Sequence, residues 1–249
     1  MNDFITGLQF LTRIKIADQS DWMPDSFGRS VKFFPVIGAI IGMILVAVNY
    51  IIDGWLPAIG FYMPPHVLAT ILTAVPILLT GGLHCDGFMD TMDGIFSGRS
   101  KERKLEIMKD SRVGANGVTT FILLILLKWS LITDIAPSLL PLALFSMPVL
   151  GRFAMVIGIT AFPYAKPDGI GKAFAQHANS RSLIIAAIFT ILLLIPLGKQ
   201  ALLSFAAVVV FTVVFAKYLT KILGGLTGDV YGAVTELTEV IVLLMFLFL

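Results

Sequence analysis

Long apolar runs separated by short polar segments dominate the hydrophobic pattern of this chain. A transmembrane helix needs about 20 predominantly apolar residues. Seven runs come close to that length, at residues 33–52, 66–83, 118–135, 139–160, 183–198, 201–220 and 234–249. Residues 1–32 instead mix apolar and polar positions, as in an amphipathic segment at the cytoplasmic surface. We therefore expect an all-α, polytopic membrane bundle of about seven transmembrane helices, forming a single domain over residues 1–249.

The composition supports a membrane protein. Hydrophobic residues make up 57% of the 249 residues and charged residues 14%, whereas soluble domains carry about 25% charged residues. The mean hydropathy is +0.91. We expect membrane lipid as a partner and no nucleic acid. The net charge of +2 says little about partners. In the first run, Gly38 and Gly42 are four residues apart, which predicts close packing against another helix.

Lysine and arginine are distributed unevenly between the two sides of the predicted bundle. Fifteen of the eighteen basic residues fall before the first run or in alternate loops, and the opposite loops hold only Lys199. Basic loops face the cytoplasm. We therefore expect a multi-pass protein of a bacterial inner membrane, with its N-terminus and its acidic motifs on the cytoplasmic side.

The first acidic motif follows the second apolar run directly. Asp86, Asp90 and Asp93 lie at positions i, i+4 and i+7, which on a helix places them within roughly 60° of one another. Three unpaired carboxylates at a membrane are costly, and acids in such segments are functional more often than not. The stripe predicts a Mg²⁺ site that grips phosphate, although a solvated helix face or pairing with nearby basic residues are simpler alternatives.

A second acidic motif lies at residues 224–239. Gly228 and Asp229 follow a glycine-rich turn, and Glu236 and Glu239 share a helix face because they are three residues apart. This segment and residues 81–117 lie on the same predicted side, so together they could build one metal–diphosphate site. The competing interpretation is that the two glutamates only pair with Lys217 or Lys221.

Basic residues near these motifs are candidates for binding phosphate. Lys109 and Arg112 flank Asp110 after the first motif, and arginine can hold phosphate oxygens in a bidentate fork. The simpler interpretation is cytoplasmic positive charge with a helix cap. Arg152, near the cytoplasmic end of the fourth run, could also reach phosphate. Lys128 lies inside the third run and needs a partner that the sequence does not identify.

Other chemistries find little support. His84 and Cys85 are adjacent, but no second His or Cys lies at a spacing suited to zinc. The single cysteine also excludes an intramolecular disulfide. The chain contains no GxSxG, Walker or GxGxxG motif, which argues against hydrolase, NTPase and dinucleotide chemistry.

Taken together, the motifs resemble those of the cobalamin synthase family, the adenosylcobinamide-GDP ribazoletransferases. The resemblance runs nearly end to end, and the combination of motifs is more specific than any one of them. It is carried by residues 8–13, 34–38, 81–87 with Asp90, Asp93 and Gly94, 107–114, and 225–229 with Gly232, Glu236 and Glu239.

The resemblance implies an enzyme that joins adenosylcobinamide-GDP to α-ribazole or its 5′-phosphate with release of GMP, completing the nucleotide loop of cobalamin. Its partners would be these corrinoid and ribazole substrates, and the sequence leaves open a homo-oligomer or docking of other corrinoid-pathway enzymes. Lys109, Arg112 and Arg152 would stabilise phosphate oxygens, with Asp110 and Gly228 nearby. Either Asp93 or Glu236 would accept the proton of the attacking hydroxyl. The expected Mg²⁺ ligands are Asp86, Asp90, Asp93, Asp229, Glu236 and Glu239.

Two rival functions remain at the level of sequence. A membrane prenyl or phosphatidyl transferase would share Mg²⁺ and a diphosphate but act on a lipid, and its usual Asn-Asp-x-x-x-Asp motif is missing here. An ion-coupled transporter would place its acids in mid-span and often shows inverted repeats, whereas these acids cluster at one predicted face.

Overall fold

The computed structural model describes residues 3–18, 23–166 and 169–249, and helices dominate this part of the chain. The first seven elements are α1 (Asp3–Leu11), α2 (Pro24–Ser30), η1 (Val31–Phe33), α3 (Phe34–Asn49), η2 (Tyr50–Trp55), α4 (Leu56–Ala58) and α5 (Pro65–Thr80). They are followed by α6 (Leu83–Phe96), α7 (Lys101–Ile107), α8 (Ala115–Asp134), α9 (Leu140–Ala161), α10 (Ile170–His177), α11 (Ser180–Leu194), η3 (Ile195–Leu197), α12 (Lys199–Leu223) and α13 (Gly228–Phe248). The described residues form no β-strand.

The number of membrane-spanning elements agrees with the sequence. Six helical stretches are long and apolar enough to cross a membrane, and the bent pair α5 and α6 makes a seventh. The six are Pro24–Ala58, Ala115–Asp134, Leu140–Ala161, Ser180–Leu197, Lys199–Leu223 and Gly228–Phe248. The prediction of an all-α bundle with about seven spans is therefore confirmed.

The second predicted run, residues 66–83, ends at a sharp bend that the sequence did not predict. Helices α5 and α6 meet at an angle of 92°, with Gly81 and Gly82 at the bend in left-handed conformations (φ 65° and 76°). Only glycine adopts such angles at little cost. The backbone amide of Arg13 also donates to the carbonyl of Leu79 at 2.7 Å, which ties the segment after α1 to this corner. The bend turns the acidic helix α6 out of the direction of α5.

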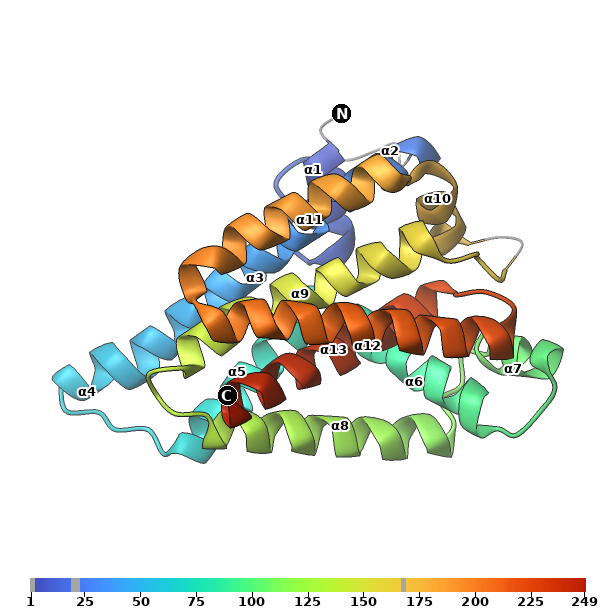
Figure 1. The fold of residues 1–249 in the computed structure, drawn as a ribbon. Coiled ribbons are helices and arrows are strands. Elements are labelled where there is room, and N and C mark those ends of the chain that lie inside the picture. The colour runs from blue at the N-terminus through green and yellow to red at the C-terminus, as the bar shows by residue number, and fades with distance from the viewer. Residues whose placement is uncertain (1–2, 19–22, 167–168) are drawn as a thin grey trace.

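Helix α9 forms the centre of the bundle and is almost completely buried. It packs most extensively against α3 and α13, with α11 and α12 also in contact (Figure 1). The predicted glycine pair makes the close approach to α3, since a Cβ at Gly42 would lie 2.8 Å from the carbonyl oxygen of Phe145 and one at Gly38 would collide with the backbone of Pro148. The packing predicted from Gly38 and Gly42 is therefore confirmed.

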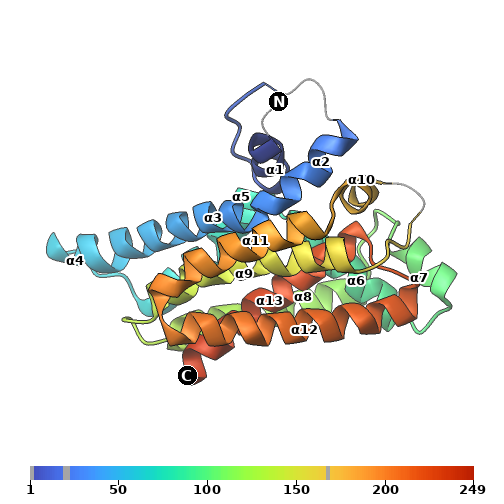
Figure 2. The same cartoon turned by 45° about the horizontal axis from the view of Figure 1, so that its top comes forward.

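The short helices α1, α2 and α10 gather at one end of the bundle (Figure 2). An aromatic cluster holds them there. The Phe174 ring of α10 lies 5.0 Å from the Phe10 ring, 5.2 Å from the Phe27 ring and 5.6 Å from the Phe34 ring, each edge-on. Such edge-to-face contacts are favourable, so α10 is fixed over this end of the spanning helices.

Candidate active site

The two acidic motifs meet because α6 and α13 approach closely through glycines. A Cβ at Gly87 of α6 would lie 2.7 Å from the carbonyl oxygen of Asp229, and one at Gly232 of α13 would lie 2.9 Å from the carbonyl oxygen of His84. Any side chain at either position would push the helices apart. The start of the acidic stripe thus faces the start of α13.

A cavity of about 360 Å³ opens beside this contact. Among the described residues, four charged side chains border it, which we call the charged rim: Asp86, Lys109, Lys166 and Asp229. The ammonium of Lys166 donates to the Asp229 carboxylate at 2.7 Å. The Asp86 carboxylate is exposed and has no hydrogen-bond or ion-pair partner within the described part of the chain. Gly228, the first residue of α13, also lines the cavity.

The third acidic residue near the rim is Asp90, which is partly buried and interacts electrostatically with Asp86, Asp229 and Lys166. Carboxylate oxygens suit Mg²⁺, which typically takes one or two of them and completes its shell with water and substrate phosphate. Within residues 3–18, 23–166 and 169–249, no three His, Cys, Asp or Glu side chains form a complete metal-ligand group. The described carboxylates nearest the cavity are those of Asp86 and Asp229, which line it, and that of the partly buried Asp90.

Asp93 has a different environment from Asp86 and Asp90. Its carboxylate is buried and accepts the backbone amides of Gly114 at 2.7 Å and Gly117 at 2.8 Å. These amides begin α8, where the first N–H groups of a helix lack partners within the helix. A negative charge at a helix N-terminus is favourable. Asp93 thus caps α8 from a distance in sequence, and it does not line the cavity.

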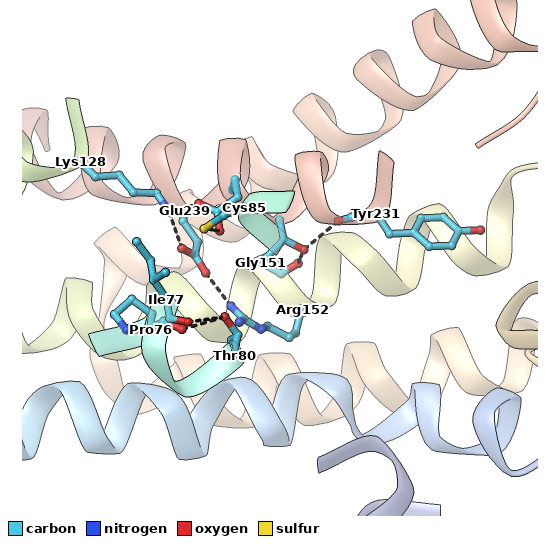
Figure 3. Close-up of polar contacts among 11 residues, drawn as sticks. Pro76, Ile77, Thr80, Cys85, Lys128, Gly151, Arg152, Tyr231 and Glu239 are labelled. Carbon is cyan, nitrogen blue, oxygen red and sulfur yellow. Dashed lines mark hydrogen bonds and ion pairs between the residues drawn. The ribbon is translucent and has the colours of Figure 1, made fainter. Parts of the chain in front are cut away.

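Four buried charges form a cluster deeper in the bundle, which we call the ion quartet: Lys128, Arg152, Glu236 and Glu239. The ammonium of Lys128 donates to Glu236 and to Glu239, both at 2.6 Å. Arg152 donates to the other oxygen of Glu239 at 2.5 Å. Figure 3 shows Glu239 between Lys128 and Arg152, with Cys85 beside it.

The ion quartet changes the expected roles of three residues. Glu236 and Glu239 pair with Lys128 and Arg152, not with Lys217 or Lys221. Neither glutamate lines the cavity. Arg152, which is 1% exposed, forms an ion pair with Glu239 and does not line the cavity. The quartet also identifies the partners of Lys128, which the sequence could not. With two charges of each sign, the cluster is neutral and leaves no buried charge unpaired, which would be strongly destabilising.

The basic residues after α6 that were candidates for binding phosphate also differ in whether they line the cavity. Lys109 lines the cavity, whereas Arg112 is exposed and uses its fork on the carboxylate of Asp110, at 2.7 Å for the shortest contact. The hydrogen bonds from Arg112 lower the pKa of Asp110 to about 2, so the pair stays charged at any physiological pH. Arg112 and Asp110 therefore stabilise the turn before α8 and do not border the cavity.

Several residues of the site escaped the sequence analysis. Lys166 counted there only toward membrane orientation, yet it pairs with Asp229. His84 was considered only for zinc, but it lies between the cavity and the ion quartet, and its Nε2 is buried without a hydrogen-bond partner among the described residues. Tyr164 and Tyr231 line the cavity as well. The sequence pattern that could have identified these cavity residues is weak, because Tyr164 and Lys166 only follow the end of an apolar run.

Comparison with known proteins agrees with the resemblance seen in the motifs. The family model described as Cobalamin-5-phosphate synthase matches residues 3–247. An adenosylcobinamide-GDP ribazoletransferase of Acetivibrio thermocellus is 38% identical, over 95% of this chain and 94% of the relative. One of Desulfitobacterium hafniense is 37% identical over 96% and 93%, and one of Fusobacterium nucleatum is 35% identical over 99% and 97%. Comparison with solved structures finds no match. The chain therefore belongs to the cobalamin-5-phosphate synthase family.

Proposed function

We propose that this chain is a membrane transferase that joins adenosylcobinamide-GDP to α-ribazole or its 5′-phosphate and releases GMP. The observation that carries the proposal is the near full-length match to relatives that bear this name. The cavity supports it, because carboxylates and lysines from both acidic motifs and their neighbours border one space. The matched relatives do not favour the alternative of a lipid-diphosphate transferase.

The reaction exchanges one phosphorus–oxygen bond for another. A ribose hydroxyl of α-ribazole attacks the phosphorus attached to cobinamide, the phosphoanhydride bond to GMP breaks, and a phosphodiester forms. Lys109 and Lys166, which line the cavity, would stabilise the phosphate oxygens on which charge accumulates. The hydroxyl must lose its proton, and a carboxylate within reach is the natural acceptor.

We propose that the Asp86 carboxylate accepts the proton of the attacking ribose hydroxyl. The candidates from sequence, Asp93 and Glu236, lie outside the cavity and their oxygens are engaged by the α8 amides and by Lys128. Among the described residues, two carboxylates line the cavity: Asp229 pairs with Lys166, and Asp86 has no partner in this part of the chain. Asp229, which pairs with Lys166 at the cavity, and the neighbouring, partly buried Asp90 are the further carboxylates that would hold magnesium, which would supply neutralisation of the diphosphate and of the leaving GMP.

The membrane orientation follows from the basic residues. The cavity is bordered by Lys109 and Lys166, which belong to the loops that hold most of the lysine and arginine. Such loops face the cytoplasm. We therefore propose that the site opens to the cytoplasm from a bacterial inner membrane, where water-soluble nucleotides reach it directly.

A transfer assay on purified protein in lipid vesicles tests the function. Adenosylcobinamide-GDP, α-ribazole phosphate and Mg²⁺ are supplied, and chromatography follows GMP and the cobalamin product, with EDTA as the metal control. We expect equal amounts of both products, and none with EDTA. A folded protein that yields neither product with Mg²⁺ present would refute the corrinoid reaction.

A further inference from the structure

The cavity has a second chemical character besides its charged rim. Its remaining described walls are mainly aromatic, aliphatic and glycine residues of α1, α6, α9, α10, α13 and the segment after α9, with His84 of α6 among them. We call the following six residues the aromatic recess: Phe10, Met155, Ile159, Tyr164, Phe174 and Tyr231. Apolar walls with a few polar groups are typical of sites that bind small organic ligands.

Packing fixes the side chains of the recess. The rings of Phe10 and Phe174 lie 5.0 Å apart, edge to face, and the rings of Tyr164 and Tyr231 lie 6.3 Å apart. Met155 and Ile159 are four residues apart on α9, so they share one helix face. Tyr231 extends away from Glu239 and Arg152, as Figure 3 shows. The recess is therefore a preformed part of the cavity, separate from the ion quartet.

The recess adjoins the charged rim on two independent segments. Tyr231 and Asp229 both line the cavity from the start of α13. Lys166 follows Tyr164 by two residues on the segment after α9. A ligand with a flat apolar group at one end and a hydroxyl or phosphate a few ångströms away would place both parts at once.

We infer that the aromatic recess binds the benzimidazole base of α-ribazole, so that its ribose and phosphate reach the charged rim. This inference rests on the proposed function, which supplies the two candidate substrates. Dimethylbenzimidazole is flat, carries two methyl groups and has one free ring nitrogen as an acceptor. That composition matches aromatic and aliphatic walls, since a buried polar group without a partner is costly.

The other substrate fits the recess less well. Guanine presents donors and acceptors along two edges, whereas outside the charged rim the described lining offers polar side-chain atoms only from Tyr164, Tyr231 and His84. The corrin macrocycle is several times larger than a benzimidazole, and a cavity of about 360 Å³ lies at the low end of the volumes that hold drug-sized ligands. The macrocycle therefore stays outside this cavity, with only its activated phosphate entering.

The test measures how much the methyl groups of the base contribute to binding in the recess. Met155→Ala enlarges the recess, Met155→Leu keeps its volume roughly constant, and Met147→Ala is the matched control, a buried methionine on the same helix that does not line this cavity. Each variant, in lipid vesicles, is titrated with radiolabelled α-ribazole phosphate and with the analogue that lacks both methyl groups. KM for each substrate is measured in parallel.

We expect Met155→Ala to weaken binding of α-ribazole phosphate about tenfold and that of the unmethylated analogue less than twofold. Met155→Leu should restore binding to within threefold, Met147→Ala should leave it unchanged, and KM for adenosylcobinamide-GDP should change less than twofold throughout. If Met155→Ala does not fold, Ile159→Val serves as the variant. An unchanged methyl preference, or a rise in KM for adenosylcobinamide-GDP alone, would overturn the inference. Methyl-selective binding without any transfer would refute the proposed function but would still support binding of the base in the aromatic recess.

Discussion

Gly87 of α6 packs directly against the backbone of Asp229 at the start of α13, where a Cβ atom would lie 2.7 Å from the Asp229 carbonyl oxygen. This contact joins two acidic motifs that are more than 130 residues apart in the chain. Because the neighbour is backbone, it cannot rotate away as a side chain could. The geometry of the charged rim therefore depends on the absence of a side chain at residue 87.

Replacing this glycine tests that dependence. Gly87→Ala should push α6 from α13, at a cost of about 1–3 kcal/mol for overpacking, and should lower the transfer rate at least tenfold by separating Asp86 from Asp229. Gly54→Ala is the matched control, since its Cβ would meet only the side chain of Tyr50, at 3.2 Å. Equal transfer rates for the two variants would show that the contact does not set the site.

Asp93 should behave as a structural residue. Asp93→Asn keeps one oxygen to accept from the amides of Gly114 and Gly117 but loses the second acceptor and the charge at the N-terminus of α8. We expect about 1–3 kcal/mol of destabilisation from the unpaired amide, measured by unfolding in mixed micelles. The Mg²⁺ concentration for half-maximal transfer should not change. A large increase in that concentration would instead place Asp93 among the metal ligands.

The ion quartet allows a charge-balance test. Lys128→Met leaves Glu236 and Glu239 with only Arg152, and breaking a buried pair this way costs about 3–5 kcal/mol. Adding Glu236→Gln should recover much of that loss, because the remaining Arg152–Glu239 pair is neutral. Unfolding free energies of the single and double variants measure the effect. Additive losses in the double variant would contradict the neutral-cluster explanation.

The sequence predicted the spans well because a membrane helix is encoded locally. Apolar runs of bilayer length are visible in composition alone, so every predicted run has a counterpart among the described helices. The bend at Gly81 and Gly82 was not predicted. Its angle depends on what α6 packs against, and that information lies in α13, far along the chain.

The site was predicted only in part, for a similar reason. Sequence spacing put Asp86, Asp90 and Asp93 on one stripe, but it could not show that Asp93 faces the start of α8. Nor could it show which charge neutralises Glu236 and Glu239. Their partners, Lys128 and Arg152, come from two other helices, and the rotation of each helix in the bundle decides such pairs. Local patterns identify candidate charges, whereas tertiary packing assigns their partners.

If the charged rim performs the transfer, release of GMP depends on the Asp86 carboxylate, and the rate of GMP release by Asp86→Asn measures that dependence. The variant is compared with wild type and with Glu102→Gln, which removes an exposed carboxylate on α7, in identical vesicles with Mg²⁺. Loss of a general base lowers rates by about 10²–10⁴-fold. We expect that loss for Asp86→Asn in a protein that still binds α-ribazole phosphate, and wild-type rates for Glu102→Gln. Asp86→Asn releasing GMP at the wild-type rate would contradict the account.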